Sequence, residues 1–149
     1  MTTRQFAAVF TAVFVPLALF ISGARGASAS TLSPGARMLA WAKANATGHW
    51  YAWGGTGLAT YDCSGLVYRS ALQTGVSGMA RTTYGMLGSR LLVRTYHPVA
   101  GDLAFYGTGH VEIVDRGYDV TFGAQQTGTQ VGDHHWSGWW RPTLYMHVL

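Results

Sequence analysis

The sequence predicts an α+β fold, because helical patterns come first along the chain and strand patterns follow. Composition agrees with this prediction. Apolar residues make up 48% of the 149 residues, charged residues make up 11%, and there are 20 glycines, which is typical of a compact, turn-rich domain. A chain of this length accommodates one domain with a core of its own.

The first helix is predicted to begin at Ser33-Pro34, with serine as the N-cap and proline at the first helical position, and to run to about Asn45. A second helix is expected to begin near Cys63, and a short third one near residues 82–88. Strand patterns follow, near residues 101–107, 110–115, 119–125, 128–133 and 143–148.

Residues 1–29 have the layout of an export signal. "MTTR" carries positive charge, "FAAVFTAVFVPLALFISG" is nearly continuous apolar sequence, and Ala27-Ser28-Ala29 fits a signal peptidase site. The alternative is an uncleaved membrane anchor, because the apolar stretch approaches the ~20 residues that span a bilayer. Pro16 and the small residues favour cleavage. We therefore expect a signal peptide over 1–29 and a domain over 30–149, secreted or envelope-associated, without stable membrane association.

The charge of the expected mature domain excludes one class of partner. The whole chain carries +4, and removal of Arg4 and Arg25 leaves 8 basic and 6 acidic side chains, a net charge of +2. The basic residues are scattered along the sequence. A nucleic-acid-binding protein would concentrate them on one face or helix, so we expect no nucleic acid partner. We also expect a monomeric protein.

The single cysteine, Cys63, cannot form an intramolecular disulfide, so it is either an inert buried thiol or a reactive one. Asp62 is a plausible N-cap, which places Cys63 in the first turn of the helix. Unpaired backbone N–H groups and the positive end of the helix dipole lie there. Such a position favours the thiolate and can stabilise an oxyanion. Gly65 leaves room where a substrate backbone could approach.

A thiol nucleophile also needs a base, and the chain has six histidines: His49, His97, His110, His134, His135 and His147. His110 is the best candidate. "GDLAFYGTGHVEIVDRG" predicts a strand, a tight glycine turn and a second strand that His110 opens, where a side chain can face a cleft. The ordinary alternative for any one of the six is a histidine at the surface or at the edge of the core.

Five motifs occur in order along the chain: "YAWGG" (51–55), "DCSGLV" (62–67), "RTTYG" (81–85), "GDLAFY" (101–106) and "HVEIV" (110–114). Together they resemble the NlpC-type family of cell-wall cysteine peptidases, over about residues 34–131. The resemblance implies a papain-like fold, with N-terminal helices packed on an antiparallel sheet of about five to six strands. It implies Cys63 as nucleophile, His110 as general base and no cofactor.

The resemblance also assigns supporting residues. Tyr51 matches a tyrosine whose hydroxyl can help to hold the oxyanion, and its alternative is aromatic core packing. Asp62 and Ser64 would support the helix start and the cleft wall. Arg81 and Asp102 match recurrent positions, where we expect structural roles in a loop ion pair or a turn cap.

The third catalytic residue is where this sequence departs from the resemblance. Many members have glycine two residues after the histidine, where this chain has Glu112, and a polar residue on the next strand, where this chain has "DVTFGAQQTG". Because side chains alternate along a strand, residues 123 and 125 should share the face of His110. Gly123 has no side chain, so we predict that Gln125 orients the imidazole. Gln126 is the reserve candidate, and a surface position for Gln125 is the alternative.

The resemblance implies hydrolysis of peptidoglycan stem peptides by acyl transfer through the thiol, at the bond between D-glutamate, through its γ-carboxyl, and a diamino residue. A related thiol amidase or acyltransferase, or a non-catalytic wall-binding module, is the alternative. "HHWSGWW" (134–140) would pack beneath the last strand or stack on sugar rings. We expect no metal, because the adjacent His134 and His135 would point to opposite faces of a strand.

Overall fold

The computed structural model describes residues 31–149, so the expected signal peptide lies outside the described residues. These described residues form three helices and nine strands. The helices are α1 (Pro34–Ala46), α2 (Cys63–Gln73) and α3 (Thr83–Leu87). The strands are β1 (Trp50–Tyr51), β2 (Thr56–Gly57), β3 (Thr60–Tyr61), β4 (Leu92–Thr95), β5 (Leu103–Tyr106), β6 (His110–Arg116), β7 (Val120–Gly123), β8 (Gly132–His135) and β9 (Leu144–Val148).

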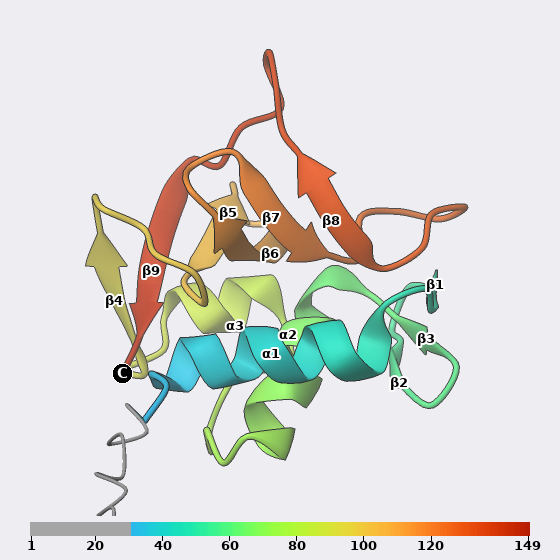
Figure 1. Ribbon diagram of the computed structural model, residues 1–149, viewed down its shortest axis with the longest axis horizontal. Helices are drawn as coiled ribbons and strands as arrows, with labels where there is room; N and C mark the ends of the chain where they lie inside the picture. The colour runs from blue at the N-terminus through green and yellow to red at the C-terminus, as the bar shows by residue number, and fades with distance from the viewer. Residues whose placement is uncertain (1–30) are drawn as a thin grey trace, which may run out of the picture. The chain divides into compact units, whose positions relative to one another are not determined.

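The main sheet has six strands in the order β4-β9-β5-β6-β7-β8, and every neighbouring pair is antiparallel. Helices α1 and α2 lie along one side of it (Figure 1). A small three-stranded sheet, in the order β1-β3-β2, immediately precedes α2. The prediction of helices packed on an antiparallel sheet of five to six strands is therefore confirmed.

The core lies between the helices and the main sheet. Met38 of α1 and Leu66 of α2 are fully buried against the inward side chains of the central strands, such as Phe105 and Ile113. The opposite face of the same strands carries a second, smaller cluster of Ala104, Tyr106 and Val114, against which Trp136 and Tyr145 pack. Because side chains alternate, His110 and Glu112 lie on this second face with Val114.

The strands of the structure differ in part from the predicted ones. The strand expected near 128–133 begins only at Gly132, because residues 126–129 form a turn closed by Thr129 and Gln126, with Gly128 at a φ of +86°. The edge strand β4 was not predicted, and neither were the two-residue strands β1, β2 and β3. No helix among residues 31–149 has the length and apolar character needed to cross a bilayer.

Candidate active site

Cys63 is the first residue of α2, as expected. Asp62 is the N-cap: its Oδ1 accepts a hydrogen bond of 2.6 Å from the Gly65 N–H. The N–H of Cys63 itself is left without an intrahelical acceptor, as at any helix start. The thiol therefore lies beside an N–H group and the positive end of the helix dipole, which both favour negative charge.

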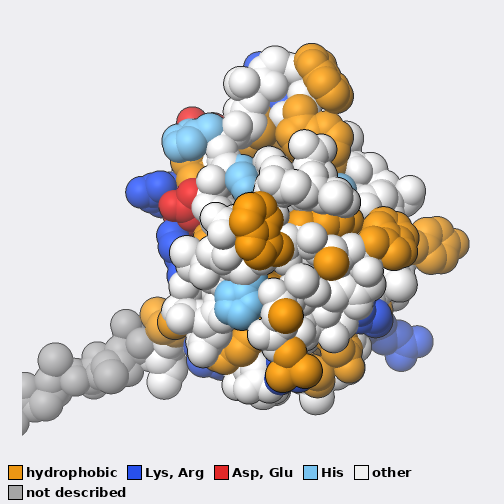
Figure 2. Space-filling model, turned by 90° about the vertical axis from the view of Figure 1, so that its right-hand side faces the viewer, with side chains coloured by type: hydrophobic (Ala, Val, Ile, Leu, Met, Phe, Trp, Pro, Cys, Tyr) orange, Lys and Arg blue, Asp and Glu red, His pale blue; other side chains and the backbone are white. Residues whose placement is uncertain are grey.

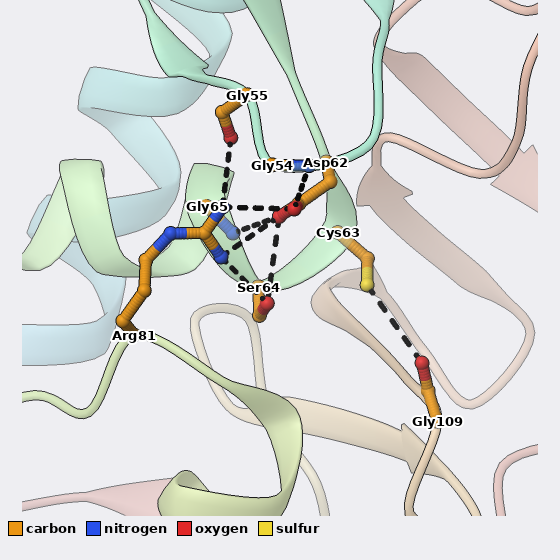
Figure 3. Close-up of polar contacts among 8 residues, drawn as sticks. All are labelled: Gly54, Gly55, Asp62, Cys63, Ser64, Gly65, Arg81 and Gly109. Carbon is orange, nitrogen blue, oxygen red and sulfur yellow. Dashed lines mark hydrogen bonds and ion pairs between the residues drawn. The ribbon is translucent and has the colours of Figure 1, made fainter.

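A bidentate ion pair holds this helix start in place (Figure 3). Arg81 Nη1 lies 3.0 Å from Asp62 Oδ1, and Arg81 Nη2 lies 2.8 Å from Asp62 Oδ2. The guanidinium also donates to the Ser64 hydroxyl at 3.0 Å and to the Gly55 carbonyl at 3.3 Å. Asp62, Ser64 and Arg81 therefore form one hydrogen-bonded network behind the cysteine.

Gly65 serves a purpose different from the expected one. A Cβ atom at this position would lie 1.9 Å from the Gly55 carbonyl oxygen. The missing side chain therefore admits the protein's own backbone, not a substrate. This close approach lets Gly55 and Gly54 wrap around Asp62, whose Oδ2 accepts from the Gly54 N–H at 2.8 Å.

Cys63 and His110 meet at the end of β6, where the sheet borders α2. The Cys63 Sγ lies 4.0 Å from the Gly109 carbonyl oxygen (Figure 3), and the imidazole of His110, the next residue, is close enough to the thiol to lower its pKa. Cys63 also lines a cleft of about 490 Å³. The other lining residues are Trp53, Gly54, Asp62, Ser64, Arg81, Thr82, Thr83, Tyr84, Thr108 and Gly109.

The imidazole has a carboxylate behind it, from Glu112. His110 Nε2 donates to Glu112 Oε1 at 3.0 Å. Gln125, the predicted partner, makes no hydrogen bond to His110 in the described part of the chain, so this prediction is corrected. The reason is that β7 ends at Gly123, and the vacant space above that glycine is filled by the Glu112 side chain from the histidine's own strand.

Glu112 is fully buried and has three hydrogen-bond donors. Besides His110, His134 Nδ1 donates to Oε1 at 3.1 Å, and the Thr121 hydroxyl donates to Oε2. Burial alone would raise the pKa of this carboxyl group, but the hydrogen bonds and the neighbouring histidine lower it to about 2. The carboxylate is therefore charged at neutral pH and faces the imidazole without solvent between them.

The electrostatics favour charge separation between thiol and imidazole. Burial would raise the pKa of the Cys63 thiol, but the hydrogen bond and charge of His110 lower this pKa from its ordinary value. Burial would lower the pKa of the His110 imidazole, but its hydrogen bonds and the negative charges of Cys63 and Glu112 raise it to about 9. Both shifts favour a thiolate beside an imidazolium, which is the reactive state of a cysteine nucleophile.

Tyr51 is half-buried and packs against the core, as one of its two interpretations required. Burial raises the pKa of its hydroxyl, and so do the charges of Cys63 and Asp62. The hydroxyl thus stays protonated near the thiol, so it can also donate a hydrogen bond. Both interpretations of Tyr51 are compatible with this position.

A second cavity of about 280 Å³ lies close to the imidazole. It is lined by Gln125, Gln126, Trp139 and Trp140. The Trp140 ring stacks on that of Tyr106, with ring centroids 5.0 Å apart, and lies 5.8 Å from the His110 ring. Trp136 and Trp140 therefore pack against the sheet, which was one of the two interpretations of this segment. Trp139 does not, because its side chain is 91% exposed.

The described residues contain no cluster of three His, Cys, Asp or Glu side chains arranged to bind a metal ion. His134 is turned toward Glu112, while the adjacent His135 is exposed.

Asp102 accepts a hydrogen bond from the Val99 N–H at 2.9 Å and one from His147 Nδ1 at 2.6 Å, which confirms its predicted role in a turn.

Glu112 is the residue behind the imidazole to which sequence reasoning gave no catalytic role. A signal was present: a charged residue replaced glycine after the histidine, while glycine stood on the next strand where a polar residue was expected. Taken together, the two departures indicate an exchange of positions between neighbouring strands.

Comparison with known proteins agrees with this arrangement. The sequence model of the NlpC/P60 family matches residues 48–147. A 94-residue segment, 60% of this chain, is 37% identical to the probable endopeptidase p60 of Listeria seeligeri. The corresponding protein of Listeria welshimeri is 36% identical over the same length. The matched part spans 17% of each of these two relatives, which are much longer proteins.

Solved structures show the same fold. The NlpC/p60 domain of the peptidoglycan hydrolase SagA has a TM-score of 0.66 and 27% identity, and the match covers 76% of this chain and 98% of that one. RipD of Mycobacterium tuberculosis, a non-catalytic NlpC/p60 domain protein, has a TM-score of 0.62 and 19% identity. That match covers 79% of this chain and 99% of RipD.

Proposed function

The chain belongs to the NlpC/P60 family, and from this membership we propose that it is a cysteine endopeptidase that hydrolyses peptidoglycan stem peptides. The observation that carries the proposal is the alignment of Cys63, His110 and Glu112, with the thiol at a helix start and the carboxylate buried behind the imidazole. The proposed bond joins the γ-carboxyl group of D-glutamate to a diamino residue.

Acylation begins when the Cys63 thiolate attacks the amide carbonyl carbon. The oxyanion that forms accepts hydrogen bonds from the Cys63 backbone N–H and from the Tyr51 hydroxyl. The His110 imidazolium then donates its proton to the amide nitrogen, the C–N bond breaks, and the amine leaves. The acyl group remains on Sγ as a thioester, with its peptide in the cleft lined by Asp62, Ser64 and Arg81.

Deacylation uses the same groups in reverse order. Neutral His110 takes a proton from water, whose oxygen attacks the thioester carbonyl. Collapse of the intermediate breaks the C–S bond and releases the carboxylic acid and the thiolate. Glu112 stabilises the imidazolium in both steps and fixes the ring so that Nδ1 faces the thiol, because Nε2 is held by the carboxylate.

Two other functions remain to be tested against this one. RipD shows that an NlpC/P60 domain can be non-catalytic, and its adaptation is to peptidoglycan binding. An amidase or acyltransferase would use the same thiol on another bond or acceptor. The intact Cys63–His110–Glu112 arrangement favours hydrolysis over a purely binding role.

The test is digestion of a defined muropeptide, with products identified by mass spectrometry. We expect new γ-glutamyl carboxyl and diamino-acid amino ends from the wild type and none from Cys63→Ala. Iodoacetamide should label Cys63 at about pH 6 faster than it labels a free thiol, whose pKa is about 8.5. Wall binding without cleavage by the wild type would instead support a binding module, and other end groups would support an amidase or transferase.

Location and assembly follow from the same proposal. A wall substrate lies outside the cytoplasmic membrane, so we propose that residues 1–29 direct export and are removed, and that the mature domain acts as a monomer in the envelope or the medium. N-terminal sequencing of the exported protein should begin near Ser30.

A further inference from the structure

The cavity close to His110 has no role in the proposed mechanism. It is bounded by the chain that follows β7, with Gln125 and Gln126, and by the β8–β9 loop, with Trp139 and Trp140. This loop forms the upper end of the domain in Figure 1, and Figure 2 shows hydrophobic side chains protruding at the same end. Trp139 is almost fully exposed, so its ring is free to meet a ligand.

The chemistry of acyl transfer says which part of a substrate lies on this side. The acyl part is bonded to Cys63 and occupies the cleft beside it. The leaving amine must reach the His110 imidazolium to receive its proton. Because Trp140 lines the second cavity and also lies 5.8 Å from the His110 ring, a leaving group that extends past the imidazole on this side would meet Trp139 and the two glutamines.

The size of the cavity limits what it can hold. At about 280 Å³ it is just below the ~300–1,000 Å³ of sites for drug-sized ligands. One amino acid residue therefore fits, and an extended glycan does not.

Its chemistry favours a cation. The rings of Trp139 and Trp140 meet nearly at right angles, with centroids 5.9 Å apart and planes at 79°. Tryptophan is the best aromatic partner for an ammonium group. Gln125 and Gln126 add carbonyl oxygens, and none of the four lining residues is charged. Arg141, the nearest basic residue along the chain, lies over Trp136 and not in this cavity.

We propose that the cavity lined by Gln125, Gln126, Trp139 and Trp140 is the leaving-group subsite, and that it binds the free ammonium group of the diamino residue's side chain. This inference rests on the proposed hydrolysis. It gives the tryptophan-rich segment 134–140 a role in selecting the residue on the amino side of the cut.

The test compares two peptides with a γ-D-glutamyl–lysine bond, one with a free ε-amine and one with that amine acetylated. Acetylation removes the charge and keeps the chain. The wild type should cleave the free-amine peptide with a kcat/KM about 3- to 30-fold higher, the range of a cation–π contact from exposed to desolvated settings. Trp139→Leu keeps an apolar side chain but removes the ring, so the ratio should fall toward one.

Tyr96→Leu is the matched control, because Tyr96 is an exposed aromatic residue that does not line the cavity. Its ratio should equal that of the wild type. A ratio of one in the wild type, or an unchanged ratio in Trp139→Leu, would overturn the subsite. A third outcome would also overturn it: a rise in kcat/KM when N-acetylmuramic acid is added to the peptide, present in the wild type and absent in Trp139→Leu. The occupant of the cavity would then be a sugar.

Binding separates this inference from the proposed function. Tryptophan fluorescence of Cys63→Ala should report tighter binding of the free-amine peptide by the same factor. If the wild type cleaves neither peptide, hydrolysis fails as a proposal, and equal affinity of Cys63→Ala for both peptides would overturn the subsite by itself.

Discussion

Glu112 of β6 occupies the space that the absent side chain of Gly123 leaves open on β7. A Cβ atom on Gly123 would lie 2.5 Å from Cγ and 2.7 Å from Cδ of Glu112. The two residues lie on the same face of the sheet as His110, so the carboxylate can accept the hydrogen bond from the imidazole only because its neighbour is glycine.

Gly123→Ala should therefore lower kcat without unfolding the domain. The new methyl group displaces the Glu112 carboxylate from His110, which weakens the acid–base contribution of ~10²–10⁴-fold, and we expect a loss of roughly tenfold to a hundredfold. Steady-state kinetics on the muropeptide measure this loss, and circular dichroism checks the fold.

Gly132→Ala provides a matched control. Gly132 is the ladder partner of Gly123 on β8, and a Cβ atom there would meet nothing within 4 Å. It should retain wild-type turnover. Equal losses of kcat in the two variants would mean that alanine disturbs the strands in general. The position of Glu112 would then not depend on glycine at position 123.

The helix starts were predictable because their signals are local. Ser33, Asp62 and Thr82 each cap a helix through a side-chain hydrogen bond to a residue three positions later. The positions of Cys63 and His110 followed from those starts and from the tight turn before β6.

The partner of His110 was not predictable in the same way, because it depends on which of two neighbouring strands supplies a side chain to a shared space. The reasoning that residues 123 and 125 share the histidine's face assumed that β7 continues to Gln125, whereas it ends at Gly123. Glu112 lies on that face by simple alternation, and only the packing against Gly123, Thr121 and His134 reveals its contact.

Arg81→Ala should destabilise the domain and misplace the nucleophile. Asp62 is nearly fully buried, and its carboxylate would lose both guanidinium contacts. Because the Arg81 side chain is 32% exposed, water can partly replace it. We therefore expect the free energy of unfolding to fall by about 2 kcal/mol, less than the ~3–5 kcal/mol lost when a fully buried pair is broken. The melting temperature should fall by about 10 °C.

Two variants check the origin of that effect. Arg81→Lys keeps the charge but not the bidentate geometry, and should recover part of the stability. Arg90→Ala removes an exposed arginine and should change the melting temperature little. If Arg90→Ala were as destabilising as Arg81→Ala, a loss of net charge would explain both, and the Asp62 clamp would not.

The pH dependence of activity tests the role of Glu112 most directly. The protonated imidazole must donate a proton to the leaving amine. Burial would lower the pKa of His110, but the hydrogen bonds and charges of Cys63 and Glu112 raise this pKa to about 9. Activity should therefore persist in mildly alkaline solution and decline as the pH rises through about 9. On the acid side, activity should appear as the thiol ionises, below its ordinary pKa, because His110 lowers that pKa.

Glu112→Gln should narrow this profile from both sides. Without the carboxylate, the pKa of His110 falls toward its ordinary value of about 6.5, so the alkaline limb of kcat/KM shifts to lower pH by at least about one unit. His110 then carries less positive charge and depresses the pKa of Cys63 by a smaller amount. The acid limb of the profile therefore shifts to higher pH. Profiles of kcat/KM from about pH 5 to about pH 10 measure both shifts.

Asp115→Asn is the control. It neutralises a buried carboxylate of the same strand, which pairs with Lys43, and should leave both limbs of the profile in place. A uniform loss of rate in Glu112→Gln with unmoved limbs would show that Glu112 only supports the local packing, and that His110 does not need its charge.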